Sequence, residues 1–448
     1  MARKRNWSRA HAARLLWRAG FGGTPKEIDY WARRGKRETI DWLIRGGRGP
    51  HGAKRMVGHA PRVGTTLDPF NEWGHDQLWW LDKMVRSQRP LVEKMTLFWH
   101  DHFATRDADT PLMLAQNNKL RKGALGSFPS LLTAVTLDPA MQEFLSLVNS
   151  NKRAPNENYA RELLELFTLG AGNGYTETDV REAARALTGF RGTASNGKPL
   201  TVYFDATRWD AGNKTLLGKT GAWGYKDVLR IAVASPKHGP FLVEKLWSYF
   251  IPEPLSSATR KRLARVYVKS GHKIAPVVRE ILEHPALYSH LEDPRMVKWP
   301  VVHIAGTLRS AGKGIDTDAW TWISAEMGQQ LFNPPSVAGW DTGTAWMSTA
   351  TMRARFLCAS YLVSKPPLKV TKNSIPTSWS SSKHIAKARS ATGSPWTSDA
   401  TDRELKRMAK EFLSAGRGRG DKLQPWQAEI TQSALRHLLL AGPDASLH

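Results

Sequence analysis

The stretch Asn156-Glu-Asn-Tyr-Ala-Arg-Glu-Leu-Leu-Glu-Leu-Phe-Thr-Leu-Gly170 carries the clearest pattern in this chain of 448 residues. Placed on a helix, its polar side chains fall within an arc of roughly 100°, and its apolar side chains lie on the opposite side. The polar set is Asn158, Arg161, Glu162 and Glu165, and the apolar set is Leu163, Leu164 and Phe167. Gly170 is a natural C-terminal stop. The stretch therefore predicts an amphipathic helix with a charged face.

A second helix is expected directly after this one. Thr176-Glu-Thr-Asp179 resembles a capping box, and the helix that follows would present Asp179, Glu182 and Arg185 at intervals of three residues. The two helices should form an antiparallel hairpin across a short Gly loop. Facing rows of carboxylates in a helical bundle can hold metal ions. The alternative is ion pairing of the carboxylates with Arg161, Arg181 and Arg185, and the Glu-x-x-His pairs of a ferritin-like site are absent.

Helical periodicity continues outward in both directions and predicts an all-α, bundle-like fold. The exception is a small β-hairpin or extended insertion around residues 196–222, where Thr201–Phe204 and Thr215–Leu217 are bounded by Gly and Asp. We expect residues 1–363 to form the main helical domain. Residues 364–400 are rich in Ser, Thr, Lys and Pro and should be irregular, and residues 401–448 should add a pair of helices packed on the main domain.

The segment Phe98-Trp-His-Asp-His-Phe103 is the second candidate for chemistry. His100 and His102 are two residues apart, so on a regular helix they point about 200° apart and cannot chelate one ion. If the helix frays there, both can be metal ligands, and we then expect Glu162, Glu165 or Asp179 to complete a site that activates water or oxygen. The alternative is that His102 is a core residue bonded to a backbone carbonyl and His100 is a surface or capping group.

Loops with turn chemistry form the third candidate group. They run from Phe204 to Thr215, from Asn333 to Trp340 and from Trp340 to Trp346. They could line a cleft on a helical scaffold, or they could simply be connections. In the cleft interpretation a substrate would contact Asn158, Arg185, Trp209, Asp210, Trp340 and Trp346, while His100, His102, Arg161, Glu162 and Glu165 would carry the catalysis.

Composition constrains the partners and the location. The formal net charge is +25, and residues 1–62 hold sixteen Lys and Arg against four Asp and Glu, which favours an anionic partner. Nucleic acid is a weaker hypothesis, because no named nucleic-acid-binding module is present. The single Cys358 excludes a cysteine-based metal site. The chain has neither an apolar run of 18 residues nor a recognisable signal peptide, so we expect no membrane insertion and a cytoplasmic protein, with export beside a partner left open.

Several of these motifs together resemble a bacterial family catalogued as domain of unknown function 1800. The resemblance rests on residues 15–22, 94–103, 138–141, 156–170, 175–189, 214–218 and 333–340. It implies no reaction, since the family has no agreed activity. It does imply a partner, because members are often encoded beside a second family that looks like sulfatases and alkaline phosphatases, and many members are exported. Members often have His where this chain has Trp209, which puts a metal site in that loop in doubt here.

The sequence thus leaves three functions open. The first is a metal-assisted enzyme, hydrolytic or oxidative, that acts on a polymeric or glycan-like substrate with a divalent or transition metal ion. The second is a non-enzymatic binding or accessory subunit for a sulfatase- or phosphatase-like partner or for an acidic polymer. The third is charge-driven binding of nucleic acid. In all three we expect the motifs at 98–103, 156–165, 179–185 and 333–340 to converge on one cleft.

Overall fold

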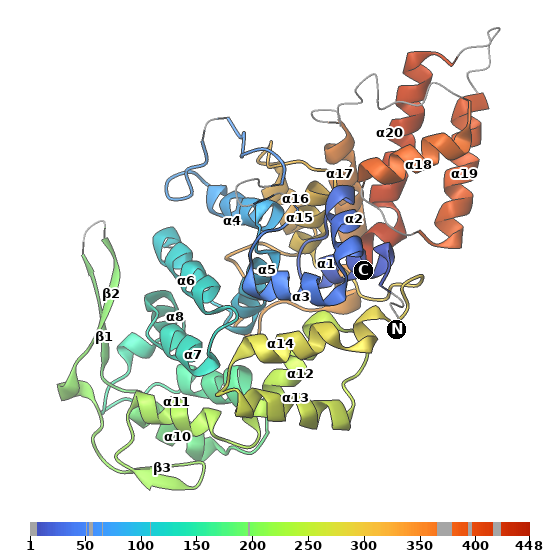
Figure 1. Cartoon of the computed structure of the whole chain (residues 1–448). Helices are drawn as coiled ribbons and strands as arrows, with labels where there is room; N and C mark the ends of the chain where they lie inside the picture. Colours follow the sequence, from blue (N-terminus) through green and yellow to red (C-terminus); the bar gives the residue numbers. More distant parts are fainter. Residues whose placement is uncertain are drawn as a thin grey trace. The chain divides into compact units, whose positions relative to one another are not determined.

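The computed structural model describes residues 7–50, 52, 57–64, 66–107, 109–195, 198–364, 379–392, 397–414 and 423–448. Helices make up most of it, which confirms the predicted all-α class with a small β insertion (Figure 1). The chain divides into two compact units. Unit 1 comprises Met1–Leu91, His284–Gln330 and Asp341–His448, and unit 2 comprises Val92–Glu283 and Leu331–Trp340. The division predicted at residues 363 and 400 stays a prediction.

Unit 1 is built from helices at both ends of the chain. Its α-helices are α1 (Arg9–Arg18), α2 (Pro25–Arg34), α3 (Lys36–Arg45), α4 (His75–Arg86), α15 (Pro300–Ser310), α16 (Ala319–Glu326), α17 (Thr349–Ser364), α18 (Ser381–Thr392), α19 (Asp399–Ser414) and α20 (Pro425–Ala441). Short helical turns lie at η4 (Pro285–Tyr288), η5 (Gly343–Trp346) and η7 (Pro443–Ser446). Thr24 and Glu27 form a reciprocal capping box, and Pro25 stands at the first position of α2, where its missing N–H costs nothing.

One expectation about unit 1 needs correction. The segment 364–400 was expected to be irregular, yet residues 381–392 form α18. Ala388 of this helix packs against Leu405 of α19 and Leu435 of α20 in a shared core. The helix has few apolar residues of its own, so its stability comes from this tertiary packing rather than from a visible periodic pattern. Residues 365–378 and 393–396 of the same segment lie outside the described residues.

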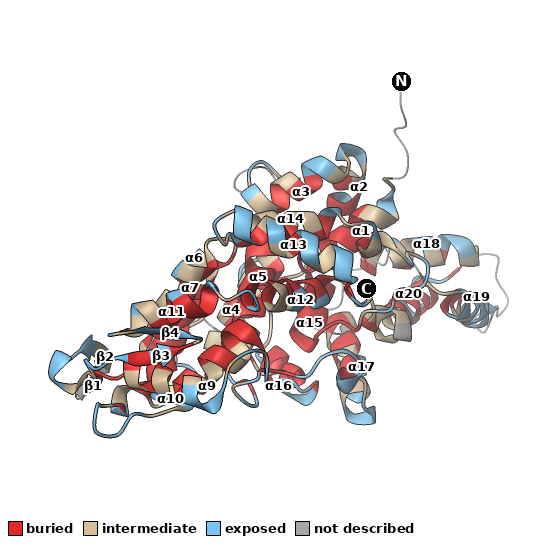
Figure 2. Cartoon of the chain, turned by 90° about the horizontal axis from the view of Figure 1, so that it is seen from below, coloured by how far each residue is buried: buried red, intermediate tan, exposed pale blue. Residues whose placement is uncertain are grey.

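Unit 2 holds the motifs singled out in the sequence. Its helices are α5 (Pro90–His102, beginning at the unit boundary), α6 (Thr110–Gly123), α7 (Phe128–Thr136), α8 (Pro139–Phe144), α9 (Asn158–Glu162), α10 (Glu177–Ala186), α11 (Tyr225–Val233), α12 (His238–Phe250), α13 (Ser257–Lys269) and α14 (Ile274–Glu283). Helical turns lie at η1 (Leu147–Asn149) and η3 (Ala206–Arg208), and η2 (Leu163–Leu169) is a π-helix. Figure 2 shows that buried residues dominate α5 and α7, and Trp99, Phe103, Phe128 and Phe167 form an aromatic core.

The β insertion consists of two consecutive antiparallel hairpins. Strand β1 (Phe190–Ser195) pairs with β2 (Lys198–Phe204), and β3 (Lys214–Leu216) pairs with β4 (Lys219–Gly221). The two segments predicted as strands therefore belong to different hairpins, and the insertion begins at Phe190. Leu217 and Gly218 both have positive φ, 47° and 74°, as a two-residue hairpin turn requires.

No helix among the described residues is long and apolar enough to cross a lipid bilayer.

A buried ion pair in unit 1 offers a test of the packing. Arg309 Nη2 lies 2.6 Å from Glu27 Oε1, and both side chains are almost fully buried. Glu27→Ala would leave the guanidinium without its carboxylate and should lower the free energy of unfolding by about 3–5 kcal/mol. Glu38→Ala, which breaks the exposed pair between Arg34 and Glu38, should change the free energy of unfolding far less, because solvent screens that pair. Urea denaturation compares the two variants, and equal losses would contradict the assigned burial.

Candidate functional site

The end of α5 presents three successive polar side chains to three different partners. His100 Nε2 accepts the Phe332 N–H at 3.2 Å, and Asp101 Oδ1 accepts the Trp340 N–H at 2.8 Å. His102 Nε2 donates to the Phe167 carbonyl at 3.2 Å. Successive residues on a helix point about 100° apart, which is why neighbours in sequence reach separate segments. The three residues fasten two distant pieces of chain to one helix.

The segment Leu331–Trp340 meets Asp101 at very close range. Gly339 has a φ of +85°, and a Cβ added there would lie 2.3 Å from Asp101 Oδ1. The Gly339 N–H also closes a turn onto the Ser336 carbonyl at 3.1 Å. Only glycine supplies both the backbone angle and the space, so the Gly339-Trp340 pair of the motif is explained by the position of this carboxylate.

The π-helix η2 ends at Gly170 and leaves carbonyl groups without helical partners. Side chains satisfy them in turn. The Phe167 carbonyl accepts from His102, the Thr168 carbonyl accepts from His238 Nδ1 at 2.9 Å, and the Leu169 carbonyl accepts from Asn173 Nδ2 at 2.7 Å. His238 Nε2 then accepts from the Tyr267 hydroxyl at 2.8 Å. Each ring nitrogen of His238 thus has a defined role, and π-helical turns of this kind are frequent at functional sites.

Lys245 is a functional candidate that the sequence reasoning missed. It lies on α12, and its Nζ is 3.4 Å from His102 Nδ1, which accepts the bond because Nε2 carries the ring proton. Burial lowers the pKa of Lys245, and the charge of Asp101 opposes this shift. The available signal was a lysine placed between Leu242 and Tyr249 on the apolar stripe of α12.

The pKa of Asp101 is shifted in the opposite direction to that of Lys245. Burial raises the pKa of its carboxyl group to about 7, against the opposing effects of the Trp340 N–H and of Lys245. Burial also holds the pKa of His102 well below its usual value, assisted by Lys245. As whole residues, Asp101 and Lys245 are partly buried. A partly buried acid and base whose pKa values both move toward neutrality mark a candidate site for proton transfer.

The charged face of α9 and η2 is organised by ion pairs. Arg161 lies 2.8 Å from Glu177 and 3.1 Å from Glu157. Glu165 accepts a bond from the Tyr175 hydroxyl at 3.2 Å. Burial, then the neighbouring charge of Glu165, raises the pKa of Glu162. The predicted pairing of Arg161 with a glutamate is confirmed.

The start of α10 fastens the second hairpin. Asp179 Oδ1 accepts the Leu217 N–H at 2.7 Å, while its Oδ2 completes the capping box with Thr176. Arg185 lies 2.9 Å from Glu182 and 2.8 Å from Asp210. These polar groups hold the β3–β4 hairpin against the helix.

The residues predicted to contact substrate have mixed exposure. Asn158 is exposed, and Trp209 is partly buried beneath the Lys214 ammonium group, 4.9 Å from its ring. Trp340, in unit 2, and Trp346, in unit 1, are 6% and 4% exposed. Neither of the last two presents a ring face to solvent, because Trp340 packs against the His100 ring and Trp346 against the Trp299 ring.

The predicted metal ligands do not fit a metal ion as they stand. Both ring nitrogens of His102 already have partners, His100 Nε2 is occupied, and Asp179 binds backbone amides. His100 is also buried rather than at the surface. Among the described residues, no three His, Cys, Asp or Glu side chains group together to hold a metal. The structure brings residues 98–103, 163–169 and 331–340 together, whereas residues 179–185 join the hairpin.

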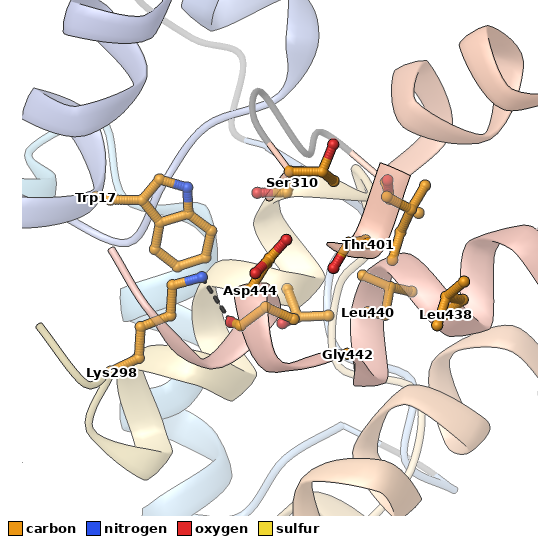
Figure 3. Close-up of a pocket in the computed structure, with 13 residues that line it drawn as sticks. Trp17, Lys298, Ser310, Thr401, Leu438, Leu440, Gly442 and Asp444 are labelled. Atoms are coloured by element: carbon orange, nitrogen blue, oxygen red, sulfur yellow. Dashed lines mark hydrogen bonds between the residues drawn. The ribbon is translucent and has the colours of Figure 1, made fainter. Parts of the chain in front are cut away.

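A separate cavity lies in unit 1, between the α15 helix, the α18–α20 helices and the C-terminal turn (Figure 3). Lys298 crosses the Trp17 ring at 3.8 Å and donates to the Ala445 carbonyl at 2.7 Å. The volume is about 40 Å³, which is room for about three ordered water molecules. None of the sequence motifs discussed above for the α9–α10 hairpin or for residues 98–103 lines it.

The protein is thus a helical scaffold in which the end of α5, His100-Asp101-His102, binds a remote loop and a π-helix. The chain belongs to the family described as "Protein of unknown function (DUF1800)", whose model matches residues 14–445. The predicted family is thereby confirmed. No curated protein and no solved structure matches the chain.

The close approach at Gly339 makes a direct test. Gly339→Ala should destabilise the protein by more than the roughly 1–2 kcal/mol that a left-handed backbone alone costs a residue with a Cβ. Gly343→Ala is the matched control, because Gly343 has a φ of +66° and no atom within 4 Å of the place that a Cβ would occupy. Thermal unfolding measures both. If Gly339→Ala loses no more thermal stability than Gly343→Ala, Asp101 does not pack against the backbone at residue 339.

The buried histidines predict acid sensitivity. Burial lowers the pKa of His100 to about 3 and that of His238 to about 4, so between these values and about 6.5 the unfolded chain binds protons that the folded chain does not. Stability should therefore fall as the pH drops from 6.5 toward 4, with Asp101 opposing the trend. His238→Gln should reduce the slope by up to about 1.4 kcal/mol per pH unit. An unaltered slope in His238→Gln would refute the assignment.

Proposed function

We propose that this protein is an enzyme and that Asp101, His102 and Lys245 form its site for proton transfer. The observation that carries the proposal is the position of Lys245 Nζ, 3.4 Å from the neutral His102 ring, on the face of α12 that holds its buried residues. A general acid or base works best when its pKa lies near the working pH. The lowered pKa of Lys245 and the raised pKa of Asp101 both point in that direction.

The three residues would have different roles. Lys245 is the proposed proton acceptor and donor, and Asp101, whose charge acts on Lys245, is a second acid–base group. His102 is a positioning residue, because both of its ring nitrogens are already engaged, one with Lys245 and one with the Phe167 carbonyl. Lys245 is held by His102, and His102 is oriented by the Phe167 carbonyl. Many enzymes activate a catalytic group through such a chain of two hydrogen bonds. The substrate class remains the polymeric or glycan-like one proposed from the sequence.

A metal-assisted mechanism receives no support from the positions of the side chains. The partners of His100, His102 and Asp179 described above would have to be released before these residues could bind an ion. We therefore assign proton transfer to Lys245 and Asp101 and give a metal ion no part in it.

A binding or accessory subunit is the second candidate. It is favoured because the polar side chains of the motifs already have partners within the chain. Arg161 and Arg185 are paired with carboxylates, and Asp179 binds the β3–β4 hairpin. A sulfatase- or phosphatase-like protein or an acidic polymer would then be the partner, with nucleic acid as a third proposal. The proposed location is the cytoplasm, and export with a partner remains the alternative proposal.

Variants of Lys245 separate the two candidates. Wild type, Lys245→Met and Lys245→Arg would be assayed on a panel of neutral and acidic polysaccharides, with product formation read by new reducing ends and by ultraviolet absorbance of unsaturated products. The proposal predicts an activity that survives chelator treatment, falls at least about a hundredfold in Lys245→Met and shifts its pH profile in Lys245→Arg.

Two outcomes would overturn it. An activity that is unchanged in Lys245→Met removes Lys245 from the chemistry. An activity that is lost on chelation and restored by a stoichiometric metal, measured by elemental analysis, replaces the proposal with the metal-assisted mechanism. Lys226→Met, the same change at an exposed position of α11 outside the group, serves as the control variant.

A further inference from the structure

Helix α13 (Ser257–Lys269) concentrates positive charge. Its sequence contains five Lys and Arg residues and no Asp or Glu. Figure 2 shows exposed residues along this helix, and Leu263 and Tyr267 are its only buried ones. The helix is therefore an outer element of unit 2 with one face in the core.

Two of the five basic residues are used to hold the helix in place. Arg260 lies 2.9 Å from Glu244 of α12 on one side, and Arg262 pairs with Glu280 of α14 on the other. A third nearby acid, Glu283, is paired with Arg279. These carboxylates are thus engaged with arginines at the flanks of α13.

The remaining three basic residues form a row on the solvent side. Lys261, Arg265 and Lys269 are exposed and stand four residues apart, so they lie within an arc of about 80° and about 6 Å apart along the axis. None of them forms an ion pair with a carboxylate of the described residues. Lys273, also exposed, follows the helix. Like charges held in a row without counter-charges repel one another, and a bound anion would relieve that repulsion.

We propose that this row, Lys261, Arg265 and Lys269, is a docking surface for a linear acidic polysaccharide. A polymer with a carboxylate or sulfate on successive sugar units matches a straight row of evenly spaced cations. The surface does not depend on the site at Lys245, although it would serve a substrate of the polymeric class proposed above.

Other polyanions fit the surface less well. Single-stranded nucleic acid is held by aromatic side chains that stack on its bases, and the one aromatic residue of α13, Tyr267, is buried. Membrane-surface helices need a broad apolar face toward the acyl chains, whereas Val268 is the one exposed large apolar residue of α13. The exposed face of α13 thus carries positive charge, but it has no aromatic ring for base stacking and no broad apolar surface.

The test uses the full chain and polygalacturonate oligomers as the probe, with binding followed by isothermal titration at low and high salt. The charge-reversed variant K261E/R265E/K269E should bind at least about tenfold more weakly than wild type and lose most of the salt dependence. The control variant R403E/K406E/K410E removes the same charge from exposed positions on α19 and should bind within twofold of wild type. Circular dichroism checks that both variants fold.

Three results would overturn the proposal. Equal weakening in both variants would mean that net charge alone attracts the polymer. Equal binding of neutral dextran would mean that charge is not recognised. Tighter binding of a thirty-residue oligothymidylate than of polygalacturonate, lost in the α13 variant, would assign the row to nucleic acid instead.

Discussion

Three consecutive side chains at the end of α5 hold the motif region together. His100 and Asp101 bind backbone amides that lie 232 and 239 residues further along the chain, and His102 binds a carbonyl at the end of the π-helix. Contacts at such separations cost considerable chain entropy. The first two bonds anchor Leu331–Trp340 on α5. The polar residues His100, Asp101 and His102 thus have a structural role, because each binds a backbone group of another segment.

The same interaction creates the candidate site. Because His102 donates from Nε2 to the Phe167 carbonyl, its Nδ1 is left as an acceptor, and Lys245 occupies that position. Because the Gly339 backbone packs against Asp101, the carboxyl group is largely removed from water, and its pKa rises. An acid and a base with displaced pKa values therefore follow from the bonds that fix the scaffold. Structural ion pairs also shift pKa values, which is why the proposal rests on position as well.

Much of the fold could be predicted from the sequence, because local signals agreed with tertiary packing. The capping box at Thr176 and the helix end at Gly170 are confirmed, as is the alternative in which His102 bonds a backbone carbonyl. Other features left no local signal. The π-helical turn needs an extra residue per turn that no pattern reveals, and the pairing of the strands depends on the Leu217-Gly218 turn. Helix α18 depends on packing, and Lys245 is visible only as one polar residue on an apolar stripe.

The protonation of Lys245 tests the central claim most directly. Nuclear magnetic resonance of the chain carrying ¹³C-labelled lysine, titrated from pH 6 upward, follows each ammonium group, and Lys245→Arg assigns its signal. The account predicts that Lys245 titrates below the usual value of about 10.4. If Lys245 titrates at that usual value, it is not held in a desolvated pair with His102, and the proposed site is contradicted.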